Sequence, residues 1–180
     1  MTEDEAIQRC QDGEREAFRP LVERHQDVVF GTAYHLTGNA ALAEELAQEA
    51  FLAAWQGIRG FRQGRPFKPW LMRILVNTVL AQRRKRSVET TPMAASGVAG
   101  GADNPATVVE AQAERQRLQR AINGLSPEHR QVVVLRYFAE LTVPEVARAS
   151  GVREGTVKSR LYRAHQALRQ RLTDAQQGQG

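Results

Sequence analysis

Hydrophobic residues recur at the helical period along almost the whole chain, and no stretch alternates as a half-buried β-strand would. Towards the C-terminal end, one stripe at the spacing of a helix carries Val157, Leu161, Ala164, Leu168 and Leu172. Upstream, Ser126 and Pro127 signal the start of one helix, and Thr142 with Glu145 forms a capping box for the next. The pattern predicts an all-α protein.

The helical pattern is interrupted once. Residues 87–110 lose the period and are rich in Gly, Ala, Ser, Thr and Pro, which is typical of a flexible linker. The pattern therefore predicts two small helical domains, at residues 1–86 and 111–174. Residues 175–180 are predicted to form a disordered tail.

The second domain has the pattern of a helix-turn-helix: a short helix, a turn at Gly151, and a second helix that is apolar behind and basic in front. Residues 155–172 hold five Lys or Arg and no acid. This face predicts contact with nucleic acid, and the candidates are Arg153, Thr156, Lys158, Ser159, Arg160 and Arg163. A merely solvated basic helix is the alternative. It is preferred for Arg169 and Arg171, where the helix dipole favours cations anyway.

The first domain has its own basic feature at residues 61–86. A loop broken by Gly and Pro carries basic and aromatic residues, and the helix after it ends in four consecutive bases. Such a loop suits single-stranded nucleic acid, because cations follow the backbone while an aromatic ring stacks on a base. Trp70 is interpreted as a core residue rather than a stacking one. Asn77 shares its helical side and is a candidate to read an unpaired base, with an ordinary surface amide as the alternative.

The helix predicted over residues 40–55 has the opposite charge. One narrow face carries Glu44, Glu45, Gln48 and Glu49, and no Lys or Arg occurs from residue 25 to 58. Over the whole chain, residues 1–56 hold 4 basic and 11 acidic residues, whereas residues 57–180 hold 21 and 9. Because an acidic face repels DNA, this helix either faces water or docks a protein.

Several classes of function are excluded by what the sequence lacks. The single cysteine, Cys10, forms no internal disulfide or CxxC metal site, and the four histidines lack metal-ligand spacing. No Gly-rich phosphate loop occurs. The sequence therefore predicts no metal, no cofactor and no enzymatic activity. No apolar run could span a membrane and no secretory signal opens the chain, which predicts a cytoplasmic protein.

Three segments carry a resemblance to a known family. In this order, "AEELAQEAFLAAW", "FKPWLMRILVNTVLAQRRKR" and "LSPEHRQVVVLRYFAELTVPEVARASGVREGTVKSRLYRAHQALRQRL" resemble bacterial RNA polymerase sigma factors of the extracytoplasmic-function (ECF) group of the sigma-70 family. The resemblance implies a specificity subunit without catalytic residues or a small-molecule substrate, monomeric when free. Its implied partners are core RNA polymerase, through the β′ clamp and the β flap, and promoter DNA. Family members are commonly held inactive by an anti-sigma factor, so such a partner is expected.

The resemblance also assigns residues. The core-polymerase contacts that it implies are Glu44, Glu45, Gln48, Glu49 and Phe51. Capture of a flipped base of the minus-ten element, and contact with the duplex just upstream, would fall to Arg62, Arg65, Phe67, Lys68, Asn77, Arg83, Arg84, Lys85 and Arg86. The minus-thirty-five element would be read by Arg153, Glu154, Thr156, Lys158, Ser159, Arg160, Tyr162 and Arg163.

The length of the predicted linker limits how far apart the two domains can lie. A flexible linker of this length reaches roughly 25 Å, whereas two sites two DNA turns apart are separated by about 70 Å. A third body, such as the polymerase, is therefore expected to hold the two domains apart, and the protein alone to bind promoters weakly. The main alternative is a conventional helix-turn-helix regulator with a sensing N-terminal domain, although neither a ligand-cavity pattern nor an alternating βα receiver pattern is visible.

Overall fold

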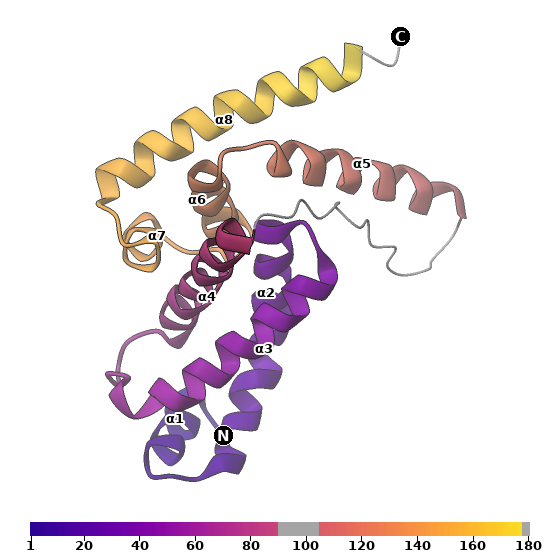
Figure 1. The fold of residues 1–180 in the computed structure, drawn as a ribbon. Coiled ribbons are helices and arrows are strands. Elements are labelled where there is room, and N and C mark those ends of the chain that lie inside the picture. Colours follow the sequence, from indigo (N-terminus) through magenta and orange to yellow (C-terminus); the bar gives the residue numbers. More distant parts are fainter. Residues whose placement is uncertain (90–104, 178–180) are drawn as a thin grey trace.

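The computed structural model describes residues 1–89 and 105–177, which form eight α-helices and two short 3-10 helices, with no strand among them (Figure 1). The predicted all-α fold is confirmed. Within these two stretches, none of the helices combines the length and apolar character that crossing a membrane requires.

The N-terminal domain is a bundle in which α2, α3 and α4 pack side by side and α1 lies at one end (Figure 1). Its elements are α1 (Glu3–Gln11), η1 (Arg15–Phe18), α2 (Arg19–Thr37), α3 (Ala40–Gly57), η2 (Ile58–Gly60) and α4 (Phe67–Glu89). The reversal between α2 and α3 takes two residues. Gly38 ends α2 in the left-handed conformation at φ 69°, and the Asn39 side chain then accepts a hydrogen bond from Leu42 N to cap α3.

The C-terminal domain contains α5 (Pro105–Asn123), α6 (Pro127–Tyr137), α7 (Val143–Ser150) and α8 (Glu154–Gln177). The predicted start and stop signals are confirmed: Ser126 caps α6, Thr142 and Glu145 form the capping box of α7, and Gly151 ends α7 at φ 69°. The predicted stripe of α8 is buried at its N-terminal end, where Val157, Leu161 and Ala164 lie in the core. Leu172, at the far end, is exposed.

Both ends of the predicted linker are helical. Helix α4 continues to Glu89 and α5 begins at Pro105, so residues 87–89 and 105–110 are not linker. A helix that has already formed adds one hydrogen bond per residue and continues through polar sequence without an apolar period, and proline is favoured at a first helical position. Residues 90–104, the rest of the predicted linker, lie outside the described residues.

The predicted tail is also shorter than expected. Helix α8 runs to Gln177, so the first three residues of the segment 175–180 extend the helix. The same propagation applies here, because nothing in this polar segment breaks a helix before its first glycine. Residues 178–180 lie outside the described residues.

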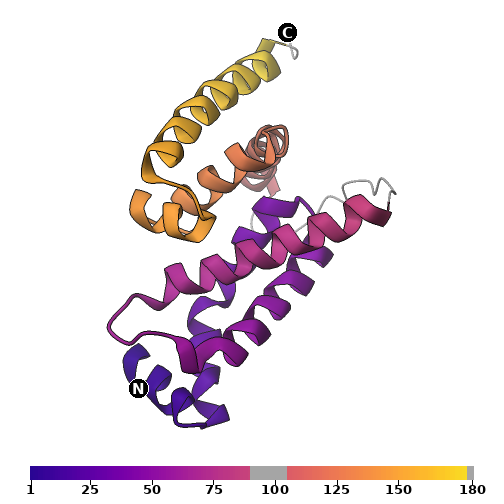
Figure 2. The same ribbon diagram turned by 60° about the vertical axis from the view of Figure 1, so that its left-hand side comes forward.

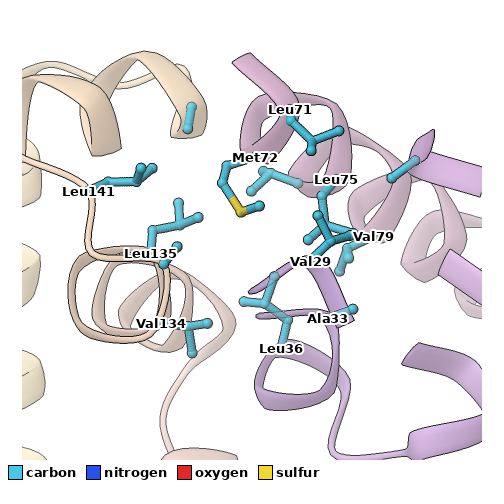
Figure 3. Packing of buried hydrophobic residues seen from close by; sticks show 14 of the residues in the cluster. Val29, Ala33, Leu36, Leu71, Met72, Leu75, Val79, Val134, Leu135 and Leu141 are labelled. Atoms are coloured by element: carbon cyan, nitrogen blue, oxygen red, sulfur yellow. The ribbon is translucent and has the colours of Figure 1, made fainter. Parts of the chain in front are cut away.

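The two domains pack directly against each other. Helix α7 lies against α4, and α5 and α6 lie against α2 (Figures 1 and 2). In Figure 3, Met72 from α4 and Leu36 from α2 lie opposite Leu135 and Leu141 of the C-terminal domain, and all four side chains are buried. The buried hydrophobic residues form a single cluster through both domains. The sequence predicted two separate tethered bodies, and this contact is the main feature that it did not reveal.

At the edge of this contact, one arginine side chain forms hydrogen bonds to backbone oxygens of both domains. Arg130 of α6 donates from Nη1 to Leu36 O at 3.2 Å, from Nε to Ile122 O at 3.2 Å and from Nη2 to Leu125 O at 3.3 Å. Its Nη2 also donates to Asn123 O. One guanidinium therefore joins the end of α2 to the turn between α5 and α6.

His35 of α2 forms a second polar link across the contact. Its ring stacks on Phe138 with centroids 3.7 Å apart, and Nδ1 donates to Gln119 Oε1 at 2.5 Å. Burial lowers the pKa of His35, and the hydrogen bond with Gln119 partly opposes this. Beside it, a Cβ at Gly38 would lie 2.8 Å from Asn123 Nδ2, so glycine is needed there for both its left-handed backbone and the close approach of α5.

Candidate nucleic-acid and protein interfaces

The N-terminal half of α8 presents a basic face away from the core. Val157 and Leu161 are buried behind it, which turns the intervening side chains outward. The exposed members of the predicted set are Arg153, Glu154, Lys158, Ser159, Tyr162 and Arg163. Among the contacts within residues 1–89 and 105–177, no hydrogen bond or ion pair involves the side chains of Arg153, Lys158 or Arg163. Three cations on one face are therefore available to an external partner.

Two members of the predicted set are engaged inside the domain. Arg160 is half-buried, and its Nη2 lies 3.8 Å from a carboxylate oxygen of Glu128 on α6. Ser159 Oγ donates to the backbone oxygen of Thr156, one turn earlier in the same helix, at 3.0 Å. Arg160 is therefore directed towards α6, and the face that the structure leaves open is narrower than the sequence indicated.

The loop before α4 is anchored by an aromatic cluster. The rings of Phe61 and Phe67 lie 5.6 Å apart at 73°, and the Trp70 ring packs against both at 5.0 and 5.4 Å. Phe67, the first residue of α4, is 0% exposed. The contact with DNA that the resemblance implies for it is therefore corrected: its ring forms the apolar base of the loop. The interpretation of Trp70 as a packing residue is confirmed. Arg62 and Arg65 project into solvent from the same loop.

Glutamine side chains hold this loop on α1. Gln11 Nε2 donates to Ile58 O at 3.0 Å and to Phe61 O at 2.7 Å. Gln63 Nε2 donates to Gln11 Oε1 at 2.7 Å and also to Gln8 Oε1. The backbone that carries Arg62 is therefore fixed by polar contacts from a helix that is distant in sequence. No role for α1 was predicted from the sequence.

A groove runs between α3 and α4. It has a volume of about 590 Å³ and is lined by Asn77 and Lys85 of α4 and by Glu49 of α3, among others. Asn77 is exposed, as its predicted role requires. It lies ten residues along α4 from Phe67, or about 15 Å at 1.5 Å per residue. The structure thus brings Asn77 beside the acidic helix rather than next to the basic loop.

The four consecutive basic residues at the end of α4 differ in their exposure. Arg84, Lys85 and Arg86 are exposed, and Lys68, at the start of the same helix, is half-exposed. Arg83 is turned inward, and its Nη2 donates to Leu36 O at 2.9 Å. Burial lowers the pKa of its guanidinium. The expectation that all four side chains reach DNA is therefore corrected for Arg83, which contacts the end of α2 in this structure.

Helix α3 presents an acidic face of the predicted composition. Leu42, Ala43, Leu46, Ala47 and Ala50 are buried, and the opposite side exposes Glu44, Glu45, Gln48 and Glu49. None of these three carboxylates forms an ion pair with the described part of the chain. Phe51 is half-buried against Phe18, with ring centroids 6.5 Å apart. Its neighbour Leu52, which was not predicted as a site residue, is 58% exposed and adds an apolar spot beside the acidic face.

Comparison with known proteins agrees with this division into two domains. The family model "Sigma-70 region 2" matches residues 21–88, and "Sigma-70, region 4" matches residues 115–168. The chain is 32% identical to the ECF RNA polymerase sigma factor SigW of Bacillus subtilis (strain 168), over 93% of this chain and 95% of that protein. It is 29% identical to the ECF RNA polymerase sigma-E factor of Escherichia coli (strain K12), over 93% of each.

Two solved structures are similar to this chain in fold. The structure of CnrH in complex with the cytosolic domain of CnrY matches with a TM-score of 0.73 at 25% identity, over 96% of this chain and 97% of that one. The sigma factor RpoE of Bartonella quintana, in complex with the anti-sigma factor NepR, matches with a TM-score of 0.74 at 25% identity, over 87% and 96%. The fold is that of a sigma-70-type protein. The chain belongs to the ECF RNA polymerase sigma factors.

Proposed function

We propose that this protein binds core RNA polymerase through the acidic face of α3 and directs transcription initiation from promoters that it recognises with the loop before α4 and with α8. The observation that carries this proposal is the opposite charge of two exposed surfaces on one chain. Glu44, Glu45 and Glu49 have no cation paired with them, and Arg153, Lys158 and Arg163 have no anion, among the contacts of the described residues. Membership of the sigma-factor family supports the same division of roles.

The acidic face suits a protein partner rather than DNA. Unpaired carboxylates on a rigid helix attract a basic surface over the Debye length, and Leu52 beside them adds apolar area to bury. DNA phosphates would be repelled from the same face. The β′ clamp is the proposed partner, with Phe51 contributing through the part of its ring that stays exposed, and the β flap is the proposed partner of the C-terminal domain.

The two basic surfaces suit two different forms of promoter DNA. Helix α8 belongs to a helix-turn-helix, so Arg153, Lys158 and Arg163 are proposed to read and hold duplex at the minus-thirty-five element. Arg62 and Arg65 stand on a fixed loop, which suits the strand that separates at the minus-ten element. Asn77 is retained as the candidate for base capture, and Arg84 to Arg86 for the duplex upstream.

The packed arrangement of the domains gives the polymerase a further role. Promoter elements two DNA turns apart require the two surfaces to be separated by about 70 Å, whereas α7 lies directly on α4 in this structure (Figure 2). Docking on the polymerase is proposed to draw the domains apart. The protein would then act in the cytoplasm, as a monomer before docking, without a cofactor or catalytic groups of its own. The described residues bring no three metal-ligating side chains together.

A protein inhibitor is also proposed. The matched RpoE structure contains the anti-sigma factor NepR, and the matched CnrH structure contains the cytosolic domain of CnrY. These are properties of those proteins. The similarity in fold supports an anti-sigma factor as a partner of this chain too.

The proposal is tested by transcription with purified core polymerase on genomic DNA, with and without this protein, and by mapping the transcript starts. New starts that share a two-part upstream motif are expected. The double variant Glu45→Lys and Glu49→Lys should lose polymerase binding and the new starts. Glu23→Lys, a charge reversal at an exposed glutamate on α2, is the matched control and should retain both. Unchanged polymerase binding by the double variant would overturn the docking role of α3. DNA binding without any new start would favour the helix-turn-helix regulator.

A further inference from the structure

A small cleft at the domain contact is lined by three arginines. Its volume is about 190 Å³, and its lining includes Arg83 and Arg86 of α4, Arg130 of α6, and the end of α2 at Leu36 and Thr37. A cleft of this volume has room for a phosphate group together with several water molecules. Its three arginines come together only while the two domains are packed, because Arg130 is contributed by the C-terminal domain and the other two by the N-terminal domain.

The positive charge in this cleft is not compensated by the protein. No carboxylate lines the cleft, and none of the three arginines forms an ion pair within the described residues. The negative feature beside them is the C-terminal end of α2, worth roughly −0.5 of an elementary charge. Arg83 and Arg130 both donate to the same backbone oxygen there, Leu36 O, at 2.9 and 3.2 Å. Three guanidiniums against half a negative charge leave a clear excess of positive charge.

The three guanidiniums differ in how firmly they are held. Arg130 makes four hydrogen bonds to backbone oxygens and is fixed in place. Arg83 makes one, which leaves most of its five N–H groups unused. Arg86 makes none within the described residues and is exposed, so it can swing over the cleft. Burial lowers the pKa of Arg130, and the charge of Arg83 lowers it further. An anion would relieve this repulsion, and the donors needed to hold one are already present.

We propose that this cleft binds a small anion of the phosphate class, either inorganic phosphate or the phosphate group of a small metabolite, held by the unused N–H groups of Arg83 and Arg86 from one domain beside the fixed positive charge of Arg130 from the other. Guanidinium forks match two phosphate oxygens at once, which selects phosphate over a spherical anion such as chloride. Because the site is shared between the domains, the bound anion stabilises their packed arrangement by mass action. The inference rests on the domain contact and not on the proposed function, although it shares Arg86 with the proposed contact to the upstream duplex.

The test compares inorganic phosphate with chloride at constant ionic strength, by isothermal titration calorimetry and by thermal unfolding. The expected result for the unmodified protein is one phosphate bound per chain and a melting temperature that rises with phosphate but not with chloride. Arg86→Gln should weaken the affinity at least tenfold and abolish the rise. It should leave the melting temperature in chloride unchanged, since Arg86 makes no hydrogen bond or ion pair within the described part of the chain.

Arg84→Gln is the matched control, because Arg84 is the nearby exposed arginine that does not line the cleft. Its phosphate affinity should stay within twofold of that of the unmodified protein. Equal losses in both variants would mean that phosphate senses the general charge of the helix end, and the site would be rejected. Retention of full binding in both, or no difference between phosphate and chloride, would also reject it. Binding of duplex DNA by Arg86 with no binding of free phosphate would assign the arginine to the promoter and overturn the proposal.

If Arg86→Gln lowers the melting temperature in chloride, Arg86→Lys provides the decisive comparison. Lysine keeps the charge and the aliphatic stem but loses the planar fork. Phosphate affinity should fall by less than in Arg86→Gln while remaining clearly below that of the unmodified protein. Hydrogen exchange supplies an independent readout: phosphate should slow exchange in α6 and α7, which pack on the N-terminal domain. Unaltered exchange in these helices at saturating phosphate would contradict a site shared between the domains.

Discussion

Helices α4 and α8 are the two longest among the described residues, at 23 and 24 residues, and both carry the basic side chains that the sequence assigned to DNA. They differ in how much of their surface the fold leaves open. Helix α8 packs on its domain through one apolar stripe, and the basic face opposite is free. Helix α4 is packed against α2, α3 and α7, and these contacts enclose Phe67 and Arg83. A basic helix therefore offers a partner only those side chains that packing does not use.

The two helices also differ in whether their basic side chains can reach DNA while the domains are packed together. The face of α8 is available in the packed protein and needs no rearrangement to meet duplex DNA. Helix α4 packs against α7 and its Arg83 is turned inward, so the basic side chains assigned to DNA that stay exposed there are Arg62 and Arg65 on the loop, Lys68 in part, and Arg84 to Arg86 at the helix end. Variants that loosen the packing on α4, or that remove a side chain from the free face of α8, test this difference.

Truncation of Met72 should loosen the contact that covers α4. Met72 is 0% exposed and lies opposite Leu135 and Leu141 of the other domain (Figure 3). Met72→Ala should lower the free energy of unfolding by about 2–5 kcal/mol, because a cavity opens in the shared core. Urea unfolding measures this loss, and small-angle scattering should show more extended molecules. Met72→Leu, which nearly conserves the volume, should cost less than about 1.5 kcal/mol. Equal stability of the alanine and leucine variants would show that the contact is loosely packed.

Removal of Arg163 should affect only the free face of α8. Arg163→Ala should weaken binding of the polymerase complex to promoters with a minus-thirty-five element by about 1–3 kcal/mol, the value of one specific base contact. The free energy of unfolding should change by less than about 0.5 kcal/mol, since the side chain is exposed and has no ion pair within the described residues. Arg169→Ala is the control, because Arg169 was assigned to solvent, and it should bind promoters normally. Equal losses in the two variants would reduce the role of Arg163 to general charge.

Removal of Gln11 should release the loop before α4. Gln11→Ala should cost about 1 kcal/mol of stability, since the carbonyls of Ile58 and Phe61 regain water when their donor is lost. Hydrogen exchange in the loop should accelerate, and promoter opening should slow while polymerase binding is kept. Gln26→Ala, at an exposed glutamine of α2, should change none of these. If hydrogen exchange in the loop accelerates but promoters open at the normal rate, a fixed loop backbone is not required for opening.

The smallest effect is expected from acidification. Burial lowers the pKa of His35 below its ordinary value of 6.5, so the unfolded chain takes up a proton at a higher pH than the folded one. The contribution of the neutral His35 to the free energy of unfolding should therefore be fully present above pH 6.5 and be lost progressively as the pH falls below that value. The groups that face the ring are Gln119, Phe138 and Tyr34, and none of them carries a charge near neutral pH. His35→Phe should keep the stacking and flatten this part of the stability profile; an equally steep profile would assign the decline to carboxylates elsewhere.

Local features of the fold were predictable from the sequence because their causes lie within a few residues. The caps at Ser126 and Thr142 and the stop at Gly151 depend on side chains and backbone conformations next to the helix ends, and all three are as expected. The exposed acidic face of α3 and the basic face of α8 follow equally from spacing along one helix. Which of their exposed residues touch polymerase or promoter DNA stays a prediction.

Features that depend on distant partners were not predictable. Arg83 is drawn inward by Leu36, 47 residues away in sequence, and composition alone could not separate it from Arg84. The contact between the domains depends on apolar positions that each domain could equally have used for its own core. Gln11 is an intermediate case: it lies four residues after Ile7, on the apolar side of α1, and a polar residue in such a place indicates a hydrogen bond that must be satisfied. The sequence did not reveal its partners, which are the backbone oxygens of Ile58 and Phe61.

The continuous buried cluster through both domains has a consequence for how the molecule responds to stress and to partners. Because this cluster is shared, we expect the two domains to melt in one cooperative transition rather than one after the other. A partner that draws them apart uncovers apolar surface and must replace it with surface of its own. Its observed affinity is then the free energy of its own interface minus the free energy of domain closure, and this difference sets a threshold that weak or accidental partners do not reach.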